Sequence, residues 1–371
     1  MLYITEVDIN DDTNKGVTEK IRCQIHTLDK AGLNCSYYRL KSEENNNSII
    51  DMVKRRLPYV NVHKHWHLDD ELVSHDNIYI RQYVPVDDFI VRFFYKLKRI
   101  NPKCRIVWEL PTYPYDDELR GEWKKRPFLW KDKYNRDKLK LFVDRIATLT
   151  NDKYIFEIPT LHIQNGINIQ KYKARKVSKD INTINIIAVS KYIFWHGYDR
   201  LFIGLYNYYN NGGNRNVVVH FVGDGMELPK YKKLVKKHNL NNHVIFYGIK
   251  IGEELDEIYN SCNIGVASLG CYRKGMNETA ELKSRDYLAK GIPFVASVKI
   301  LDIPEAVEND IYLRVPNDDS PIDIENVLNF YDRIYSESAE QVNNRLRQFA
   351  KDHFSMEVAM KEVIDFFKEG K

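Results

Sequence analysis

The chain has 371 residues, of which 43% are hydrophobic and 29% charged, and its net charge is +4. This length predicts two domains, and a mean hydropathy of −0.50 without a long apolar run excludes a membrane-spanning helix. The five cysteines are scattered without a CxxC pair, which indicates reduced thiols. The first residues lack the basic and apolar regions of a signal peptide, so we expect a cytoplasmic protein.

Short apolar runs alternate along the chain with helical patterns. Strands are predicted at residues 2–7, 78–81, 105–110, 146–150, 184–189, 217–222, 244–247, 264–267 and 294–296. Several of these runs are apolar throughout, as in strands that are covered on both faces. In residues 227–240 and 253–262 the apolar side chains share one helix face. Such alternation predicts an α/β protein with parallel sheets and right-handed crossovers.

The alternation pauses at a polar run before residue 184. We therefore predict an N-terminal doubly wound domain at 1–170, a linker at 171–182 and a C-terminal doubly wound domain at 183–352. Residues 353–371 are amphipathic and are expected to form a helix that packs back on the N-terminal domain. A ligand is expected between the two halves, at the carboxyl ends of their strands.

Three loops that directly follow predicted strands of the second half carry polar and glycine residues. The first includes Lys191 and His196, the second is Val222-Gly223-Asp224-Gly225, and the third runs from residue 270 into a helix that begins near Ser284. The cations expected at this one edge are Lys191, His196, Arg273, Lys274 and Lys283. Together with a helix N-terminus, they predict a phosphate-binding site.

These loops resemble, in the same order, the C-terminal half of the retaining GT-B-fold glycosyltransferases of family 4 (glycosyltransferase group 1). Lys191-x4-His196-Gly197 resembles the family's basic-x4-Lys-Gly, and Val222-Gly-Asp-Gly225 resembles its V-G-x-G turn. Glu278-x7-Asp286 resembles its E-x7-E motif, with histidine and aspartate standing where the family usually has lysine and glutamate. In the first half, the segment around Gly16 fits the family's glycine loop. The segment that starts at Glu109 is similar to capsular and O-antigen transferases.

The resemblance implies a GT-B fold, in which two Rossmann-like doubly wound domains face each other across a cleft. It implies transfer of a hexose or N-acetylhexosamine from a UDP- or GDP-sugar to a glycan or lipid-linked saccharide, in bacterial surface polysaccharide synthesis. The implied catalytic residues are Glu278, Lys191, His196 and Glu109, the last as an acceptor-orienting group. The implied donor-binding residues are Gly16, Lys191, His196, Gly223, Gly225, Gly248, Ile251, Glu278, Lys283, Ser284 and Asp286.

No metal or other cofactor is expected. The chain has no D-x-D triplet, and cations with a helix N-terminus can offset the charge of the leaving diphosphate. Histidines 63, 65 and 67 have the spacing of ligands on one strand face, but no fourth ligand lies near them in sequence, so a surface loop is favoured. Residues 123–140 interleave eight basic residues with four aromatics, which suits peripheral contact with the anionic inner face of the plasma membrane. A solvated helix face is the alternative.

Other interpretations remain open for individual residues and for the whole chain. Asp286 can complement a helix dipole, Lys283 can be an exposed charge, and Glu109 can pair locally. The glycines can serve only tight strand-to-helix turns. For the whole chain, the alternatives are a non-catalytic nucleotide-sugar-binding subunit and a GT-B-fold sugar-nucleotide epimerase.

Overall fold

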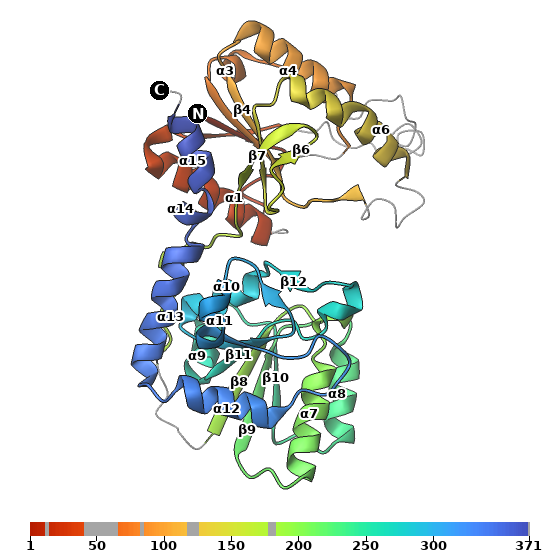
Figure 1. Cartoon of the computed structure of the whole chain (residues 1–371), viewed down its shortest axis with the longest axis vertical. Helices are drawn as coiled ribbons and strands as arrows, with labels where there is room; N and C mark the ends of the chain where they lie inside the picture. Colours follow the sequence, from red (N-terminus) through yellow and green to blue (C-terminus); the bar gives the residue numbers. More distant parts are fainter. Residues whose placement is uncertain (12–14, 41–65, 82–84, 117–125, 177–182, 370–371) are drawn as a thin grey trace. The chain divides into compact units, whose positions relative to one another are not determined.

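The computed structural model describes residues 1–11, 15–40, 66–81, 85–116, 126–176 and 183–369. It divides into two compact units, which are treated separately here (Figure 1). Unit 1 consists of Met1–Gly166 and Met356–Lys371, and unit 2 of Ile167–Ser355. The division after Gly166 falls a few residues before the expected linker, whose residues 177–182 lie outside the described part of the chain.

Unit 1 contains a seven-stranded sheet in the order β2-β1-β3-β4-β5-β7-β6. The pairings are parallel except for that of β6 with β7. The strands are β1 (Leu2–Thr5), β2 (Ser36–Arg39), β3 (Asn77–Arg81), β4 (Arg105–Leu110), β5 (Arg145–Thr148), β6 (Tyr154–Ile155) and β7 (Ile158–His162). The helices are α1 (Lys15–Leu28), η2 (Asp29–Leu33), α3 (Asp70–Val73), α4 (Asp88–Ile100), α6 (Arg126–Arg136), η4 (Asp137–Leu141), α14 (Met356–Ala359) and α15 (Lys361–Lys368).

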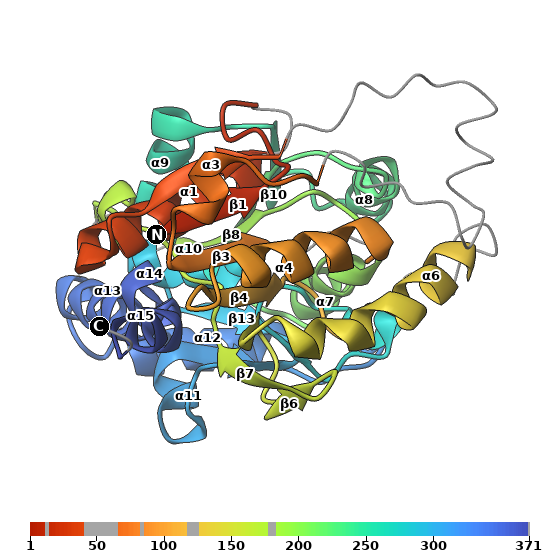
Figure 2. The ribbon, with the colours of Figure 1, turned by 90° about the horizontal axis from the view of Figure 1, so that it is seen from above.

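The sheet of unit 1 is covered on both faces, because alternate side chains of a strand point to opposite sides. Ile4 and Ile80 belong to a core cluster with Phe93 of α4. Tyr3 and Tyr79 belong to a second cluster, with residues of α1, α14 and α15. Helices α4 and α6 lie side by side in both ribbon views (Figures 1 and 2). These two apolar layers explain why β1, β3 and β4 are almost wholly buried.

The C-terminal residues from Met356 onward belong to unit 1 and form two short helices, α14 and α15. Gly166 lies against the first of them, because a Cβ at this position would come within 2.5 Å of the Cβ of Ala359. The amide of Gln164 also donates a hydrogen bond to the carbonyl of Ala359. A glycine is therefore required where the chain leaves unit 1 beside its returning C-terminus.

Unit 2 contains a six-stranded parallel sheet in the order β10-β9-β8-β11-β13-β15. The strands are β8 (Thr183–Val189), β9 (Asn216–Val222), β10 (Val244–Gly248), β11 (Ile264–Val266), β13 (Phe294–Ala296) and β15 (Tyr312–Arg314), with β12 (Glu278–Thr279) and β14 (Lys299–Ile300) as a separate pair. The helices are η5 (Ile169–Lys171), η6 (Phe194–His196), α7 (Asp199–Asn210), α8 (Leu228–Lys237), α9 (Gly252–Ser261), η7 (Cys271–Lys274), α10 (Leu282–Lys290), α11 (Glu305–Ile311), α12 (Ile324–Ile334) and α13 (Ala339–Phe354). Figure 1 shows α7 and α8 on one side of this sheet and α9 on the other, which is the doubly wound arrangement.

The nine strands predicted from the sequence are all present, with ends that shift by a few residues. The prediction of an α/β protein with two parallel sheets is confirmed. Strands that the sequence did not reveal are short or lie at sheet margins, such as β15 and β2. Strand β7 contains Pro159, which argues against a strand from sequence but is tolerated beside an edge.

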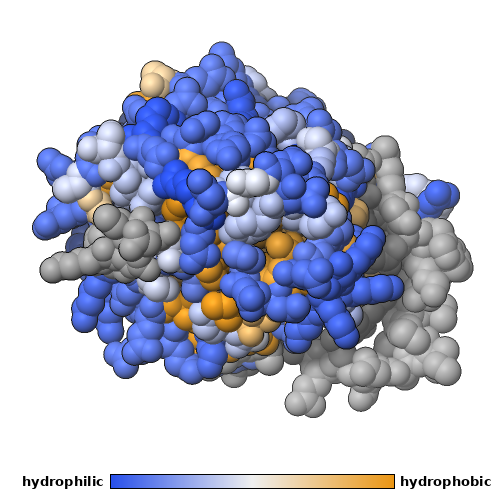
Figure 3. Space-filling model, turned by 90° about the horizontal axis from the view of Figure 1, so that it is seen from below, coloured by the Kyte–Doolittle hydropathy of each residue, from blue (hydrophilic) through white to orange (hydrophobic). Residues whose placement is uncertain are grey.

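The face of the molecule seen in Figure 3 is mainly hydrophilic, with small apolar patches between charged side chains. Small patches of this kind are normal for a folded protein surface. The described residues of this face therefore form no broad apolar surface.

Candidate nucleotide-sugar site

The order of the unit 2 sheet marks one place where a ligand can bind. Along the chain the strands run outward in one direction from β8 through β9 to β10, and then in the other from β11 through β13 to β15. The loops after β8 and β11 therefore diverge from neighbouring strands, which opens a crevice at the carboxyl ends. The predicted site residues of unit 2 lie in or just after loops that leave the sheet at this edge, whereas Gly16 and Glu109 belong to unit 1.

A pocket of about 840 Å³ lies among the loops that follow β8, β9 and β10. Its lining includes Lys191, Gly223, Gly225, Ile249 and Lys250. Three of these residues belong to the donor-binding set predicted from the sequence. The structure brings them together around one cavity, large enough for part of a nucleotide sugar.

The two glycines of the β9 loop are required by the packing of the loops. Gly223 has φ +131°, and a Cβ there would lie 1.9 Å from the carbonyl oxygen of Ser190. Gly225 has φ +156°, and a Cβ would lie 2.3 Å from the carbonyl oxygen of Tyr192. The β9 loop therefore lies directly against the β8 loop, and this contact brings Lys191 to the pocket. Gly223 and Gly225 are thus required for a tight turn, as the simpler interpretation of the sequence has it. The same two glycines also line the pocket.

Lys191 is exposed, and its ammonium group makes no ion pair or hydrogen bond with the described residues. A lysine without an internal partner that lines a pocket keeps its charge available to a ligand. His196 is different, because it is buried and its Nδ1 lies 2.9 Å from the Ser190 hydroxyl. Burial, with Lys283 and Lys274 nearby, lowers the pKa of His196 to about 3. His196 is therefore neutral at physiological pH and adds no positive charge to the site.

Lys283 extends from the first turn of α10 toward the loop that follows β11. Its ammonium lies 3.5 Å from a carboxylate oxygen of Glu281 and donates to the Ser268 hydroxyl at 3.1 Å. Burial lowers the pKa of Lys283, and Glu281 partly opposes this shift. Glu281 also accepts hydrogen bonds from the amide and the hydroxyl of Ser268. The ammonium group of Lys283, which was predicted to contact a phosphate, thus already lies beside the carboxylate of Glu281. Nothing in the sequence indicated this pairing.

Ser284 and Asp286 are two positions apart in the first half of the same helix, α10. The Ser284 hydroxyl donates to the carbonyl of Glu281 and accepts from Arg285, so it is engaged within the helix. Asp286 is half-buried and accepts a hydrogen bond on Oδ1 from the Tyr172 hydroxyl. Burial raises the pKa of Asp286 to about 6, against the opposing effects of Tyr172 and Lys290. Asp286 is thus a carboxylate held in place at neutral pH.

Glu278 begins β12, opposite Lys299 of β14, and its side chain is exposed. Its carboxylate makes no hydrogen bond or close ion pair with the described residues. A pocket of about 420 Å³ lies beside it, lined by polar residues that include Asn277, Lys299 and Asn317. An exposed, uncommitted carboxylate beside a polar pocket suits a contact with sugar hydroxyl groups.

The loop that follows β10 carries the residues predicted to lie near the base. Gly248 has φ +68°, and its carbonyl accepts a hydrogen bond from the amide of Gly223. Ile249 and Ile251 are 72% and 66% exposed, and Ile249 lines the larger pocket. Exposed isoleucines at the rim of a pocket provide an apolar surface for a flat ring.

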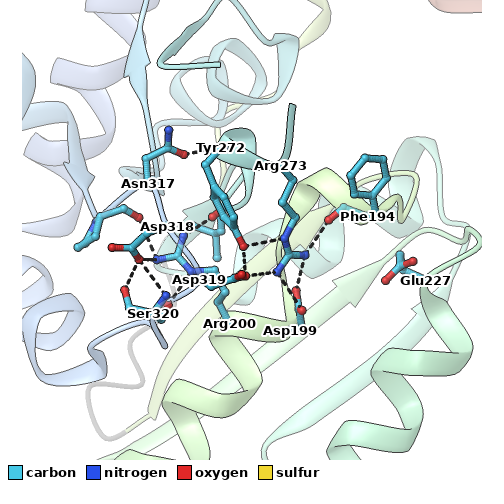
Figure 4. A network of polar contacts seen from close by, with 12 residues as sticks. Phe194, Asp199, Arg200, Glu227, Tyr272, Arg273, Asn317, Asp318, Asp319 and Ser320 are labelled. Atoms are coloured by element: carbon cyan, nitrogen blue, oxygen red, sulfur yellow. Dashed lines mark hydrogen bonds and ion pairs between the residues drawn. The ribbon is translucent and has the colours of Figure 1, made fainter. Parts of the chain in front are cut away.

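Arg273 was predicted among the cations of the site, but its guanidinium is paired with carboxylates of the protein (Figure 4). Its guanidinium bonds both carboxylate oxygens of Asp199 at 3.0 Å, and it also reaches Asp319 and the carbonyl of Phe194. Nearby, the buried Arg200 donates to carbonyls of the loops after β11 and β15. These two arginines tie together the loops after β8, β11 and β15, and so hold the edge of the sheet in shape.

Glu109, which was predicted to orient the acceptor, lies in the interior of unit 1. It is wholly buried, with Oε1 2.6 Å from Arg81 and 3.9 Å from the ammonium of Lys20. Its Oε2 accepts from the hydroxyl of Tyr79 at 3.1 Å. Burial alone would raise the pKa of Glu109, but Arg81 and Lys20 more than offset this, so its pKa lies below the ordinary value. This geometry agrees with the alternative of local pairing and gives Glu109 no surface for an acceptor.

The remaining predicted features are partly described. Gly16 lies in the first turn of α1, and no described atom comes within 4 Å of a Cβ built there. His63 and His65 lie outside the described residues. The described residues contain no group of three histidine, cysteine or carboxylate side chains that could hold a metal ion. Metal independence remains a prediction.

The basic and aromatic segment 123–140 is described from Arg126 onward. Trp130 and Tyr134 of α6 are 63% and 71% exposed, four residues apart on one helix face. Lys133 and Arg136 pair instead with Asp116, and Lys131 is buried. In the part of the chain that the structure describes, no helix has both the length and the apolar character needed to cross a membrane.

The residues that sequence reasoning missed are the partners of the predicted ones. Tyr172 is separated from Asp286 by 114 positions, and Ser268 from Lys283 by 15. No spacing rule connects such positions, because only the sheet order brings them together.

Comparison with known proteins gives the fold and the domain. Residues 172–330 match the family model described as Glycosyl transferases group 1. No curated protein sequence matches the chain. Among solved structures, the Anabaena protein Alr3699/HepE in complex with UDP has a TM-score of 0.61 at 13% identity, covering 99% of both chains. Sucrose-phosphate synthase from Thermosynechococcus elongatus has a TM-score of 0.61 at 15% identity, covering 99% of this chain and 98% of its own.

A glycosyltransferase from Rickettsia africae is also similar, with a TM-score of 0.59 at 13% identity, over 100% of this chain and 97% of its own. Identities this low show the fold alone. The family match falls on unit 2, where three of the predicted donor-binding residues line one pocket. The fold is thus GT-B. Residues 172–330 match the glycosyltransferase group 1 domain, and the assignment as a glycosyltransferase enzyme rests on this match.

Proposed function

We propose that the protein is a retaining glycosyltransferase that moves a hexose or N-acetylhexosamine from a UDP- or GDP-sugar to a glycan or lipid-linked saccharide, in bacterial surface polysaccharide synthesis. The observation that carries the proposal is the pocket at the carboxyl edge of the unit 2 sheet, where Lys191 stands beside the glycine loop of β9. The UDP complex of the Anabaena structural relative supports a nucleotide-sugar donor.

In this proposal the diphosphate lies beside Lys191, whose charge offsets the negative charge that grows on the leaving group. Lys283 adds a second, partly neutralised cation, while His196 supports the loop as a neutral residue. Asp286 accepts hydrogen bonds from the ribose, and Glu278 accepts them from the donor sugar. The residues at Gly248–Ile251 hold the base. We expect no metal, because Lys191 and the partly neutralised Lys283 offset part of the charge of the diphosphate.

The transfer occurs on one face of the sugar. The bond between the anomeric carbon and the diphosphate oxygen breaks, and a bond from the acceptor oxygen to the same carbon forms on the same side. The acceptor proton passes to the departing phosphate oxygen, so no protein nucleophile is needed. Glu278 steadies the positive charge that develops at the sugar ring. Glu109, which is buried and paired in unit 1, has no part in this scheme.

Binding tests the proposal first. Thermal unfolding of the full chain is measured with UDP, GDP and ADP and with their glucose and N-acetylhexosamine conjugates. We expect UDP or GDP and one of its sugars to raise the Tm, because a ligand that binds only the folded state stabilises it. Stabilisation by none of these compounds would refute the proposal. Binding without turnover across a panel of saccharide acceptors would favour the non-catalytic alternative.

We further propose that α6 contacts an anionic membrane surface through Trp130 and Tyr134. Exposed aromatic rings beside basic residues are typical of peripheral membrane contacts, and Lys138 lies 3.9 Å from the Tyr134 ring centroid. Co-sedimentation with phosphatidylglycerol vesicles should be lost in the Trp130→Ala, Tyr134→Ala double variant. Equal sedimentation of both proteins, or equal binding to phosphatidylcholine, would contradict this role.

A further inference from the structure

Tyr172 connects the entry of the chain into unit 2 with the helix that carries the proposed ribose contact. Its hydroxyl donates to Oδ1 of Asp286 at 2.5 Å. Its backbone is held as well, because Arg347 of α13 donates to the carbonyl of Tyr172 at 3.0 Å and to the carbonyl of Ala289 on α10. The tyrosine and the helix are therefore fixed to each other by two separate contacts.

The bond from Tyr172 leaves the two oxygens of Asp286 in different situations. Oδ1 is occupied by the tyrosine hydroxyl, whereas Oδ2 makes no hydrogen bond with the described residues. The residue keeps some solvent exposure, so Oδ2 is the oxygen that remains for a ligand. A carboxylate with one oxygen held cannot rotate freely about its last torsion angle, and so it presents the other oxygen in one direction.

We propose that Tyr172 is a positioning residue of the nucleotide site, which holds the Asp286 carboxylate so that its free oxygen receives a ribose hydroxyl of the donor. This inference rests on the proposed function, in which Asp286 binds the ribose. An aspartate is one methylene shorter than a glutamate, and the tyrosine hydroxyl fixes this shorter side chain from behind. Preorganisation lowers the entropy cost of binding, so Tyr172 contributes to affinity without touching the ligand.

The charged and titratable groups around Asp286 are few and come from three elements. Tyr172 approaches from the segment after η5, Lys290 lies one turn further along α10, and Tyr259 lies on α9. Lys290 is itself paired with Asp256 of α9. Burial raises the pKa of Asp286 to about 6, and the bond from Tyr172 opposes that rise. Removal of the hydroxyl is therefore expected to raise the pKa of Asp286 further.

The test compares ribose with deoxyribose ligands. Dissociation constants of UDP, GDP and their 2′-deoxy and 3′-deoxy forms are measured by calorimetry on the wild-type full chain and on Tyr172→Phe. We expect the wild type to prefer a ribonucleotide over at least one deoxy form. In Tyr172→Phe, ribonucleotide affinity should fall about three- to tenfold, the value of one hydrogen bond, while affinity for that deoxy form stays nearly constant.

Tyr335→Phe is the matched control. The Tyr335 hydroxyl accepts from Arg175 at 2.6 Å and donates to the carbonyl of Asn263 at 2.8 Å, so this variant also loses one tyrosine hydroxyl of unit 2. It should leave the ratio of ribose to deoxyribose affinity unchanged. A change of that ratio in Tyr335→Phe equal to that in Tyr172→Phe would overturn the inference, because it would then reflect general loosening.

A pH profile gives a second readout that a purely structural role would not alter. Ribonucleotide affinity of the wild type should fall as the pH drops below about 6, where Asp286 takes up a proton. In Tyr172→Phe this fall should begin at higher pH. In Asp286→Asn only the part that comes from protonation of the nucleotide's terminal phosphate should remain. Unchanged profiles and ratios in Tyr172→Phe would overturn the inference while the proposed function stood. Failure of the wild type to bind any nucleotide would overturn both.

Discussion

Charged residues near the carboxyl ends of the strands differ between the two units: some are exposed in unit 2, whereas Glu109 is buried in ion pairs in unit 1. In unit 2, Lys191 and Glu278 are exposed, and their charged groups make no hydrogen bond or close ion pair with the described residues. In unit 1, the glutamate at the end of β4 is buried between Arg81 and Lys20. A charge paired inside the protein is already satisfied, whereas an unpaired charge at a pocket remains available to a ligand. The contrast separates a carboxylate that maintains the fold from residues that can act on a substrate.

The largest expected effect is the loss of stability on removal of the buried carboxylate, Glu109. Glu109→Ala should lower the free energy of unfolding by about 3–5 kcal/mol, because it leaves Arg81 buried without a counter-charge. Urea unfolding measures this change. Glu157→Ala is the control in the same unit, since it breaks an exposed ion pair with Lys140 and should cost at most about 1 kcal/mol. If the two variants lost equal stability, Glu109 would not be the structural residue described here.

Removal of the exposed carboxylate, Glu278, should affect turnover. Glu278→Ala should reduce kcat by about 10²–10³-fold, in the range found when one group that stabilises a transition state is removed. Its stability and its affinity for UDP or GDP should change little, because the side chain is exposed and does not line the pocket beside Lys191. Turnover with a saccharide acceptor, measured beside nucleotide binding, separates these effects. Wild-type turnover in this variant would remove Glu278 from the proposed mechanism.

Lys191 should influence binding more than stability. Lys191→Ala should weaken nucleoside diphosphate affinity about ten- to hundredfold, because it removes a charge-assisted contact worth roughly 1.5–3 kcal/mol. Lys237→Ala, at the end of α8, removes an exposed charge and should have no effect on affinity. Calorimetry with UDP and GDP at low and high salt is the appropriate measurement. An equal loss in both variants would indicate only a general effect of net charge.

His196 should affect the acid stability of the protein. Its pKa is about 3 when folded, below the ordinary value near 6.5, so the unfolded chain binds a proton that the folded chain excludes. Stability should therefore fall as the pH drops from about 6.5 toward 3, and His196→Gln should reduce that slope. Tm measured across this range tests the sign. A slope unchanged by the substitution would mean that the imidazole is protonated in the folded protein.

The sequence revealed much of unit 2 and less of unit 1. Apolar strands such as β8 and β9 were visible because burial on both faces leaves a continuous hydrophobic run. The ordered motifs around Gly223 and Glu278 indicated the loops that meet at the sheet edge. The burial of Glu109 could not be predicted from the sequence, because its partners Arg81 and Lys20 come from elements distant in the chain. The neutral state of His196 depends likewise on burial that only tertiary packing creates.

The most direct test of the central claim is a crystal structure of the full chain with UDP or GDP, whichever raises the Tm. We predict that the diphosphate lies beside Lys191 and the glycine loop of β9, with the ribose at Asp286 and the base near Ile249. A nucleotide bound at the carboxyl edge of the unit 1 sheet, without contact to Lys191, would contradict this account.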